Sequence, residues 1–345
     1  MTQPLIYADP TSQAHDGGAD HPERPERLRA CLDACASAGF AVEESLPAAT
    51  DEQLARVHDP MYVARLQRFC ERGGGRMDPD TYVTEASFAI ARRASGAACA
   101  AVDRALNDEG ATFCLVRPPG HHATQARGMG FCLLNHVAVG AAHAIASGAR
   151  RVAIVDFDVH HGNGTQDIFW DRSDVAYLSL HQFPWYPGTG LLEEIGGGAG
   201  AGATLNIPLP AGTPDAVYLA AFRRIVLPAL DRWKPDLIAV SAGYDAHHRD
   251  PLASMRMTSA GFGTMTSLLM AAADRLCAGR ILMTLEGGYD LKALGSSLVA
   301  TLQAMGDPTG HAGHAGEDDG PLDGPPESVA ALERAEAFHR APAAT

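Results

Sequence analysis

The chain has 345 residues, of which 46% are hydrophobic and 20% charged, and its formal net charge is −14. This composition is typical of a globular protein whose core needs no disulfides, and an acidic chain without a basic patch excludes nucleic acid as an expected partner. The seven cysteines have no CxxC spacing, the first residues form no secretory leader, and no apolar run is long enough to span a membrane. We therefore expect reduced thiols, a cytoplasmic location and no membrane partner.

Apolar, β-rich segments alternate with segments of helical periodicity along the chain. Strands are predicted at residues 5–8, 112–116, 151–157, 175–180, 204–207, 237–241 and 281–285. Helices are predicted at residues 22–38, 52–71, 85–107, 133–147, 214–231, 259–277 and 291–305. This alternation predicts one α/β domain over residues 1–305, with a mostly parallel multi-stranded sheet and helices on both faces.

The end of the chain has a different composition. Residues 306–327 are rich in Gly, Pro and Asp and have few apolar side chains, which predicts a surface loop or linker. Residues 328–345 are predicted to be a C-terminal segment with a short helix at 329–338.

Polar motifs follow five of the predicted strands. In a parallel sheet, ligands bind beyond the carboxyl ends of the strands, so we expect these motifs to converge on one site. The motifs are residues 117–122, 156–164, 181–190, 241–248 and 286–290.

The run after the third predicted strand has the side chains of a metal site. Asp156, Asp158 and His160 are two residues apart, so they share one face if the chain stays extended. The turn at residues 162–164 is expected to end that strand. A lone Asp and His are typical of a capped strand end, but Asp245 adds a carboxylate at another strand end, and such a group is costly unless it binds a cation. Asp158, His160 and Asp245 are therefore predicted to bind a catalytic metal, with Zn²⁺ preferred and Fe²⁺ or Mn²⁺ also compatible.

Histidine and tyrosine side chains in the neighbouring motifs are candidates for acid–base chemistry. His121 and His122 follow a rigid Pro-Pro-Gly turn, and imidazole titrates near neutral pH. Asp156 and Asn163 are predicted to orient the two rings through hydrogen bonds. Tyr289 follows two glycines and could donate to a developing oxyanion, although a turn aromatic is the ordinary interpretation of that motif alone.

Aromatic residues near the motifs are candidates for the walls of a narrow substrate channel. Phe131 follows Gly-Met-Gly, and Phe183 precedes the segment Pro-Trp-Tyr-Pro-Gly-Thr-Gly. Each alone is more typical of simple packing.

Taken together, these motifs resemble those of the histone deacetylase family, which has the arginase–deacetylase fold. The resemblance spans about residues 5 to 300 and rests on residues 21–27, 117–122, 130–132, 156–164, 179–181, 187–190, 241–245 and 286–289. It implies one Zn²⁺ per chain on Asp158, His160 and Asp245. It also implies a structural K⁺ near Asp156, Asp158, His160, Ser179 and Leu180.

The resemblance further implies a reaction. A metal-activated water would attack an acetamide carbonyl, with His122 as the general base and then the acid, and His121 as its electrostatic partner. Tyr289 would polarise the carbonyl and stabilise the oxyanion. The implied substrate is acetyl-lysine or a similar acetylated amine.

Two positions bear on the subgroup. Asn163 stands where class I members have Asp, so the chain is similar to class II-like bacterial relatives. An acetylpolyamine amidohydrolase is the alternative, but its polyamine-specialised relative has Glu where this chain has Leu252, a further candidate for the channel wall. A non-catalytic acyl-lysine binding protein is disfavoured because the whole catalytic set is present. The sequence is also compatible with a homo-oligomer.

Overall fold

The computed structural model describes residues 3–18, 20–307 and 322–340. Eight strands form one sheet in the order β2-β1-β5-β10-β9-β6-β7-β8, and every neighbouring pair is parallel. In sheet order, the strands are β2 (Val42–Glu43), β1 (Leu5–Ala8), β5 (Thr112–Leu115), β10 (Ile281–Leu285), β9 (Leu237–Ala242), β6 (Val152–Asp156), β7 (Val175–Gln182) and β8 (Thr204–Leu209). The predicted parallel sheet is confirmed. Only the two-residue β2, which is too short to show a period, was missed in it.

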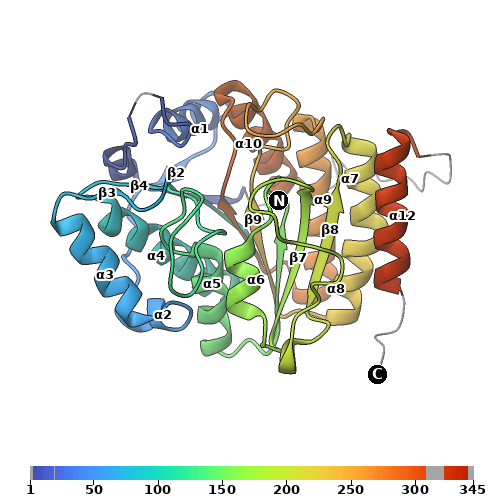
Figure 1. Cartoon of the computed structure of the whole chain (residues 1–345), viewed down its shortest axis with the longest axis horizontal. Coiled ribbons are helices and arrows are strands. Elements are labelled where there is room, and N and C mark those ends of the chain that lie inside the picture. The colour runs from blue at the N-terminus through green and yellow to red at the C-terminus, as the bar shows by residue number, and fades with distance from the viewer. Residues whose placement is uncertain (1–2, 19, 308–321, 341–345) are drawn as a thin grey trace.

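Helices cover both faces of the sheet (Figure 1), because neighbouring strand residues point to opposite sides. Val155 and Met283 belong to one hydrophobic core, whereas Ile154 and Leu282 belong to the other. The first core contains α1 (Glu26–Ser37), α7 (Asp215–Ala221), α8 (Leu227–Trp233), α9 (Ser259–Cys277), α10 (Leu291–Gly306) and α12 (Pro326–Arg340). The second contains α2 (Asp51–Ala55), α3 (Pro60–Glu71), α4 (Ser87–Leu106), α5 (His136–Ala146) and α6 (Asn163–Phe169).

Proline lies within two of the predicted helices. The helix predicted at 52–71 is two helices: α2 ends at Ala55, and Pro60 begins α3, which Asp59 caps by accepting from Met61 N. The helix predicted at 214–231 contains the π-helical segment η3 (Phe222–Val226), which precedes Pro228 in α8. A small antiparallel pair, β3 (Gly75–Arg76) and β4 (Tyr82–Val83), lies outside the main sheet.

The region of the predicted metal motif differs from the extended chain we expected. β6 ends at Asp156, so Asp158 and His160 lie in bends beyond the strand and do not share a strand face. The segment predicted as a turn at 162–164 begins α6, whose first residue is Asn163. The expectation of a single extended edge is therefore wrong, although the side chains still converge.

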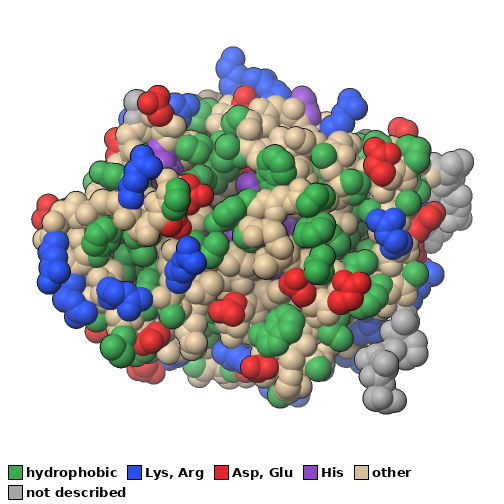
Figure 2. Space-filling model, viewed as in Figure 1, with side chains coloured by type: hydrophobic (Ala, Val, Ile, Leu, Met, Phe, Trp, Pro, Cys, Tyr) green, Lys and Arg blue, Asp and Glu red, His purple; other side chains and the backbone are tan. Residues whose placement is uncertain are grey.

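The C-terminal helix is longer than predicted. α12 spans Pro326–Arg340 and packs along β8, where His339 Nε2 donates to the Asn206 carbonyl at 2.8 Å. Most of the predicted loop, residues 308–321, lies outside the described residues. All seven cysteines are buried and free. None of the described helices has the length and apolar character needed to cross a membrane. Acidic and basic side chains both occur across the face seen in Figure 2, and histidine side chains show at its centre.

Candidate active site

The candidate site forms where four neighbouring strands end. β5, β10, β9 and β6 are adjacent in the sheet, and Asp156, Ser241 and Thr284 are register partners across three of them. The loops that leave these strands therefore start at the same edge. They carry residues 117–122, 286–289, 243–245 and 157–162, in sheet order.

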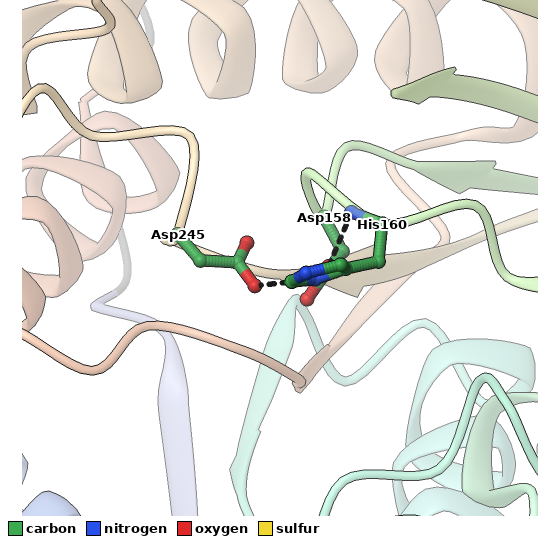
Figure 3. Close-up of side chains that lie close together, drawn as sticks. All are labelled: Asp158, His160 and Asp245. Atoms are coloured by element: carbon green, nitrogen blue, oxygen red, sulfur yellow. Dashed lines mark hydrogen bonds and ion pairs between the residues drawn. The ribbon is translucent and has the colours of Figure 1, made fainter. Parts of the chain in front are cut away.

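Three side chains from two of these loops form a compact cluster (Figure 3). Donor atoms of Asp158, His160 and Asp245 all lie within 4.8 Å of one another. His160 Nδ1 is 3.0 Å from Asp245 Oδ2 and 3.2 Å from Asp158 Oδ1. Backbone N–H groups hold the carboxylates in place, since Gly287 N donates to Asp158 Oδ2 at 2.7 Å and Val159 N to Asp245 Oδ1 at 3.0 Å.

The chemistry of this cluster fits a divalent cation. Both carboxyl groups are buried next to each other, which is costly unless a positive charge is present. Gly287 lets the loop approach closely, because a Cβ there would lie 2.1 Å from Asp245 Oδ2. His160 also lines a cavity, so a cation at this place would be accessible to substrate. Two carboxylates and one imidazole beside a cavity are typical of a catalytic zinc site with an open position.

The two adjacent histidines have different hydrogen-bond partners. His121 Nδ1 lies 3.0 Å from Asp156 Oδ2, and that same oxygen accepts from the Tyr177 hydroxyl at 3.0 Å. His122 Nδ1 lies 2.8 Å from Asn163 Oδ1. Since both partners are acceptors, each Nδ1 carries a hydrogen. In His122, whose pKa is low, Nε2 keeps a lone pair. The two rings are tilted by 44° with centroids 4.0 Å apart.

Their surroundings shift the two imidazoles in opposite directions. Burial lowers the pKa of His121, but the charges of Asp158 and Asp156 outweigh it and raise the pKa to about 10. Burial, with the charges of His121 and His160, lowers the pKa of His122 well below 6.5. A bound dication would neutralise Asp158 and so reduce the upward shift at His121. The pair therefore contains one ring that is stabilised as a cation and one that is held neutral.

Tyr289 enters the same cavity from the loop after β10. Its ring centroid is 5.8 Å from that of Phe131, and the Arg27 guanidinium lies 4.8 Å from it on another side. Burial raises the pKa of Tyr289 well above 10, although Arg27 opposes the shift. The hydroxyl is therefore protonated at neutral pH and can donate a hydrogen bond.

The cavity has a volume of about 250 Å³. His121, His122, His160 and Tyr289 line it and are all buried. Phe131, Leu252, Trp185 and Tyr186 also line it, and the last two are 43% and 38% exposed, which places them at its mouth.

Phe183, predicted as a wall, is not among the described residues that line the cavity. Its backbone N–H still donates to Leu209 O at 2.8 Å, so Phe183 continues the ladder of β7 with β8. Tyr186 and Trp185, after the ladder ends, reach the cavity instead. The sequence offered three nearby aromatics and no signal to choose among them.

The predicted wall residue Phe131 has an unusual backbone. Gly130 and Phe131 both have positive φ, 55° and 68°, between Met129 and Cys132, which exchange backbone hydrogen bonds at 3.0 and 2.9 Å. This is the pattern of a two-residue type I′ turn. A Cβ at Gly130 would lie 2.5 Å from His122 Cδ2, so glycine is needed there. A phenylalanine in the left-handed region is strained, and here this backbone conformation places the ring in the cavity wall.

Further buried charged residues support the site, and no role could be assigned to them from the sequence. Glu286 Oε2 accepts from the N–H of Gly120 at 2.6 Å and of His121 at 3.1 Å, which fixes the backbone of the histidine pair. Glu23 lies between two buried arginines, Arg117 at 2.6 Å and Arg27 at 3.0 Å. These contacts join segments up to 261 residues apart, because Arg27 Nε also donates to Gly288 O. Local patterns carry no signal for pairings of that range.

The residues predicted to surround K⁺ lie in β7, at the end of β6 and in the bends just beyond it. Ser179 in β7 is the register partner of Asp156 in β6, and Leu180 is the next residue in β7. Ser179 Oγ is 2.9 Å from His181 Nδ1. The ion itself stays a prediction.

Comparison with known proteins agrees with this geometry. The family model described as the histone deacetylase domain matches residues 21–305. The chain is 44% identical over 279 residues to a histone deacetylase-like amidohydrolase of Pseudomonas aeruginosa, covering 79% of this chain and 73% of that protein. It is 38% identical to the chloroplastic histone deacetylase 14 of Arabidopsis thaliana, covering 97% and 84%. The solved structure of the HDA15 HD domain superposes with a TM-score of 0.89 at 34% identity, covering 98% of this chain and 95% of that one.

The fold and the site thus define a hydrolase with the arginase–deacetylase fold. The chain belongs to the histone deacetylase family, and is by that membership a deacetylase-type hydrolase.

Proposed function

We propose that the protein is a zinc-dependent amidohydrolase that removes acetyl groups from acetyl-lysine side chains or similar acetylated amines. The observation that carries this proposal is the convergence of the Asp158–His160–Asp245 cluster, the histidine pair and Tyr289 on one cavity. Those three cluster residues would hold the ion. A bound Zn²⁺ supplies Lewis acidity, which polarises a carbonyl oxygen and lowers the pKa of water.

His122 supplies the base and then the acid. Its Nδ1–H is anchored on Asn163, so its Nε2 lone pair is free to take a proton from the attacking water. The low pKa keeps that nitrogen unprotonated before the reaction. The same proton then passes to the leaving amine. His121, held by Asp156, stands beside the ring and adds positive charge near the developing oxyanion.

Tyr289 donates its hydroxyl hydrogen to the carbonyl oxygen as negative charge develops there. Its raised pKa keeps this hydrogen in place at the working pH. The walls of Phe131, Leu252 and Tyr186 suit the alkyl chain of a lysine and exclude water from the reacting amide.

The test is the release of acetate from an acetyl-lysine peptide by the purified, zinc-loaded protein. Tyr289→Phe and His122→Ala are each expected to lower kcat by roughly a hundredfold or more, as expected for loss of an oxyanion donor or general base. Tyr218→Phe is the matched control, because its buried hydroxyl has no hydrogen-bond partner among the described residues. A hydroxamate should inhibit the wild type. Full activity of either site variant would contradict the mechanism.

An acetylpolyamine is the second candidate substrate. Asp80 is a carboxylate in the cavity lining and could pair with the free ammonium of a polyamine. Leu252 is apolar, however, and offers no second charge on the opposite loop. Parallel assays with acetylpolyamines and peptides separate the two, and binding without acetate release would instead indicate a non-catalytic acyl-lysine binding protein.

We also propose that a structural K⁺ binds near Asp156, Asp158, His160, Ser179 and Leu180. The pairing of Asp156 in β6 with Ser179 in β7 supports this proposal. Thermal stability that rises with K⁺ but not with an equal concentration of tetramethylammonium would test it.

A further inference from the structure

We propose that Asp250 is a positioning residue for Tyr289, and that it couples the tyrosine to the opposite wall of the cavity. The proposal rests on the proposed function, in which Tyr289 is the oxyanion donor. Asp250 itself does not line the cavity among the described residues, so it acts through the residues it holds.

The carboxylate of Asp250 binds the peptide of Tyr289 directly. Its Oδ2 accepts from Tyr289 N at 2.6 Å and from Asp290 N at 3.3 Å. Asp250 is 7% exposed, so little water can substitute for its carboxylate. An N–H left without its partner at this depth costs roughly 1 to 3 kcal/mol.

The other oxygen of the same carboxylate binds within Asp250's own loop. Asp250 Oδ1 accepts from Leu252 N at 3.0 Å, and Leu252 O accepts from the Trp185 indole N–H at 2.9 Å. Leu252, Trp185 and Tyr289 all line the cavity. One carboxylate therefore holds Tyr289 in place relative to Leu252 and Trp185 in the cavity wall.

The loop that carries Tyr289 needs such an anchor because of its sequence. Gly287 and Gly288 precede the tyrosine, and Gly288 has φ of +118°, so the backbone on that side is permissive. Arg27 contacts this segment from the other side, through the carbonyl of Gly288 and over the Tyr289 ring. Asp250 is the side-chain acceptor for the Tyr289 N–H, and the ring direction depends on that peptide.

The experiment is a double-mutant cycle between Asp250→Ala and Tyr289→Phe in the full chain, assayed with an acetyl-lysine peptide. Asp250→Ala is expected to lower kcat by roughly ten- to a hundredfold, as a misplaced catalytic group does, with little change in KM. In the Tyr289→Phe background it should cause no further loss of kcat, because the hydroxyl it positions is absent. Asp250→Asn, which keeps one oxygen, should fall between the wild type and Asp250→Ala.

Asp215→Ala is the matched control. Asp215 is a half-buried carboxylate that binds the end of this long loop, at Thr258, where its two oxygens accept from the backbone N–H and the hydroxyl. It should lower thermal stability without lowering kcat. The proposal is overturned if the kcat losses of Asp250→Ala and Tyr289→Phe multiply in the double variant. It is also overturned if Asp215→Ala and Asp250→Ala lower kcat equally, because Asp250 would then have only a structural role.

A crystal structure of Asp250→Ala supplies a readout that does not depend on activity. The Tyr289 ring should leave its place 5.8 Å from Phe131 and 4.8 Å from the Arg27 guanidinium. A ring that stays there overturns the proposal even if no substrate is turned over. Failure of the wild type on every acetylated substrate, with a displaced ring in the variant, would instead refute the proposed function alone.

Discussion

His122 is bound through Nδ1 to the amide oxygen of Asn163 at 2.8 Å, an uncharged partner. The neighbouring His121 has a carboxylate, Asp156, at the equivalent place. Burial and the charges of His121 and His160 lower the pKa of His122, and the uncharged Asn163 opposes them only weakly, whereas the charges of Asp158 and Asp156 raise the pKa of His121. An amide at this place therefore leaves the His122 ring neutral and able to act as a base.

Asn163→Asp should reverse part of that asymmetry. A carboxylate at this position favours the protonated ring, so the pKa of His122 should rise. Since the neutral ring is the reactive base, the acidic limb of the kcat/KM profile should move to higher pH. Asn107→Asp, which adds the same charge at an exposed site, is the control. An unchanged acidic limb would show that His122 is not the group that controls it.

Gly287→Ala should weaken metal binding. The added Cβ would lie 2.1 Å from Asp245 Oδ2 and 2.6 Å from Asp158 Oδ2, so the two proposed ligands must move. Zinc affinity, measured by competition with a chelating dye, should fall by roughly ten- to a hundredfold, as it does when groups that orient ligands are changed. Gly306→Ala is the control, because among the described residues its Cβ would meet Pro4 alone, at 3.6 Å. Equal zinc affinity in both variants would contradict the assignment of the ligands.

The strands were predictable because most are buried on both faces and therefore consist of apolar runs. Val152–Asp156 and Ile281–Leu285 are examples in which every residue is buried. Their order in the sheet was not predictable, yet the carboxyl ends of all parallel strands lie at one edge. For that reason the polar motifs could be expected to converge without the strand order.

The path of the backbone around the site was less predictable. Asp158 and His160 converge with Asp245 through bends after β6, held by backbone N–H groups such as that of Gly287. Such contacts join residues over a hundred positions apart and leave no periodic pattern. The carboxylates of Asp250 and Glu286 leave no such pattern either: they hold the backbone of Tyr289, 39 residues away, and of His121, 165 residues away.

Tyr186→Ala should change substrate binding more than Phe183→Ala. Tyr186 lines the cavity, and its ring is 5.2 Å from that of His122, whereas Phe183 does not line the cavity. Loss of the Tyr186 ring removes an apolar wall and should raise KM for an acetyl-lysine peptide by roughly tenfold. The two variants form a matched pair within one loop. A larger effect from Phe183→Ala would mean that the loop rearranges when substrate binds.

Acid should destabilise the fold through buried histidines away from the proposed metal ligands. His58 accepts from Asn135 N at Nε2 (2.9 Å) and lies 3.1 Å from Thr124 O through Nδ1, so the neutral ring fits both partners. Burial lowers the pKa of His58 and of His136 from 6.5 to about 4. Above pH 6.5 both rings are neutral in the folded and the unfolded chain. Between pH 6.5 and 4 only the unfolded chain binds protons, so the free energy of unfolding falls as pH falls.

The loss should approach roughly 3 kcal/mol for each ring at pH 4, since one pKa unit corresponds to about 1.4 kcal/mol. Urea unfolding at pH 7, 5.5 and 4 measures it, and His136→Gln should make the dependence on pH shallower because one titrating group is gone. His136 Nε2 donates to Pro118 O at 3.0 Å, a bond that a glutamine amide can replace. A variant with the wild-type slope would show that this ring is already protonated in the folded protein, and that the acid sensitivity has another source.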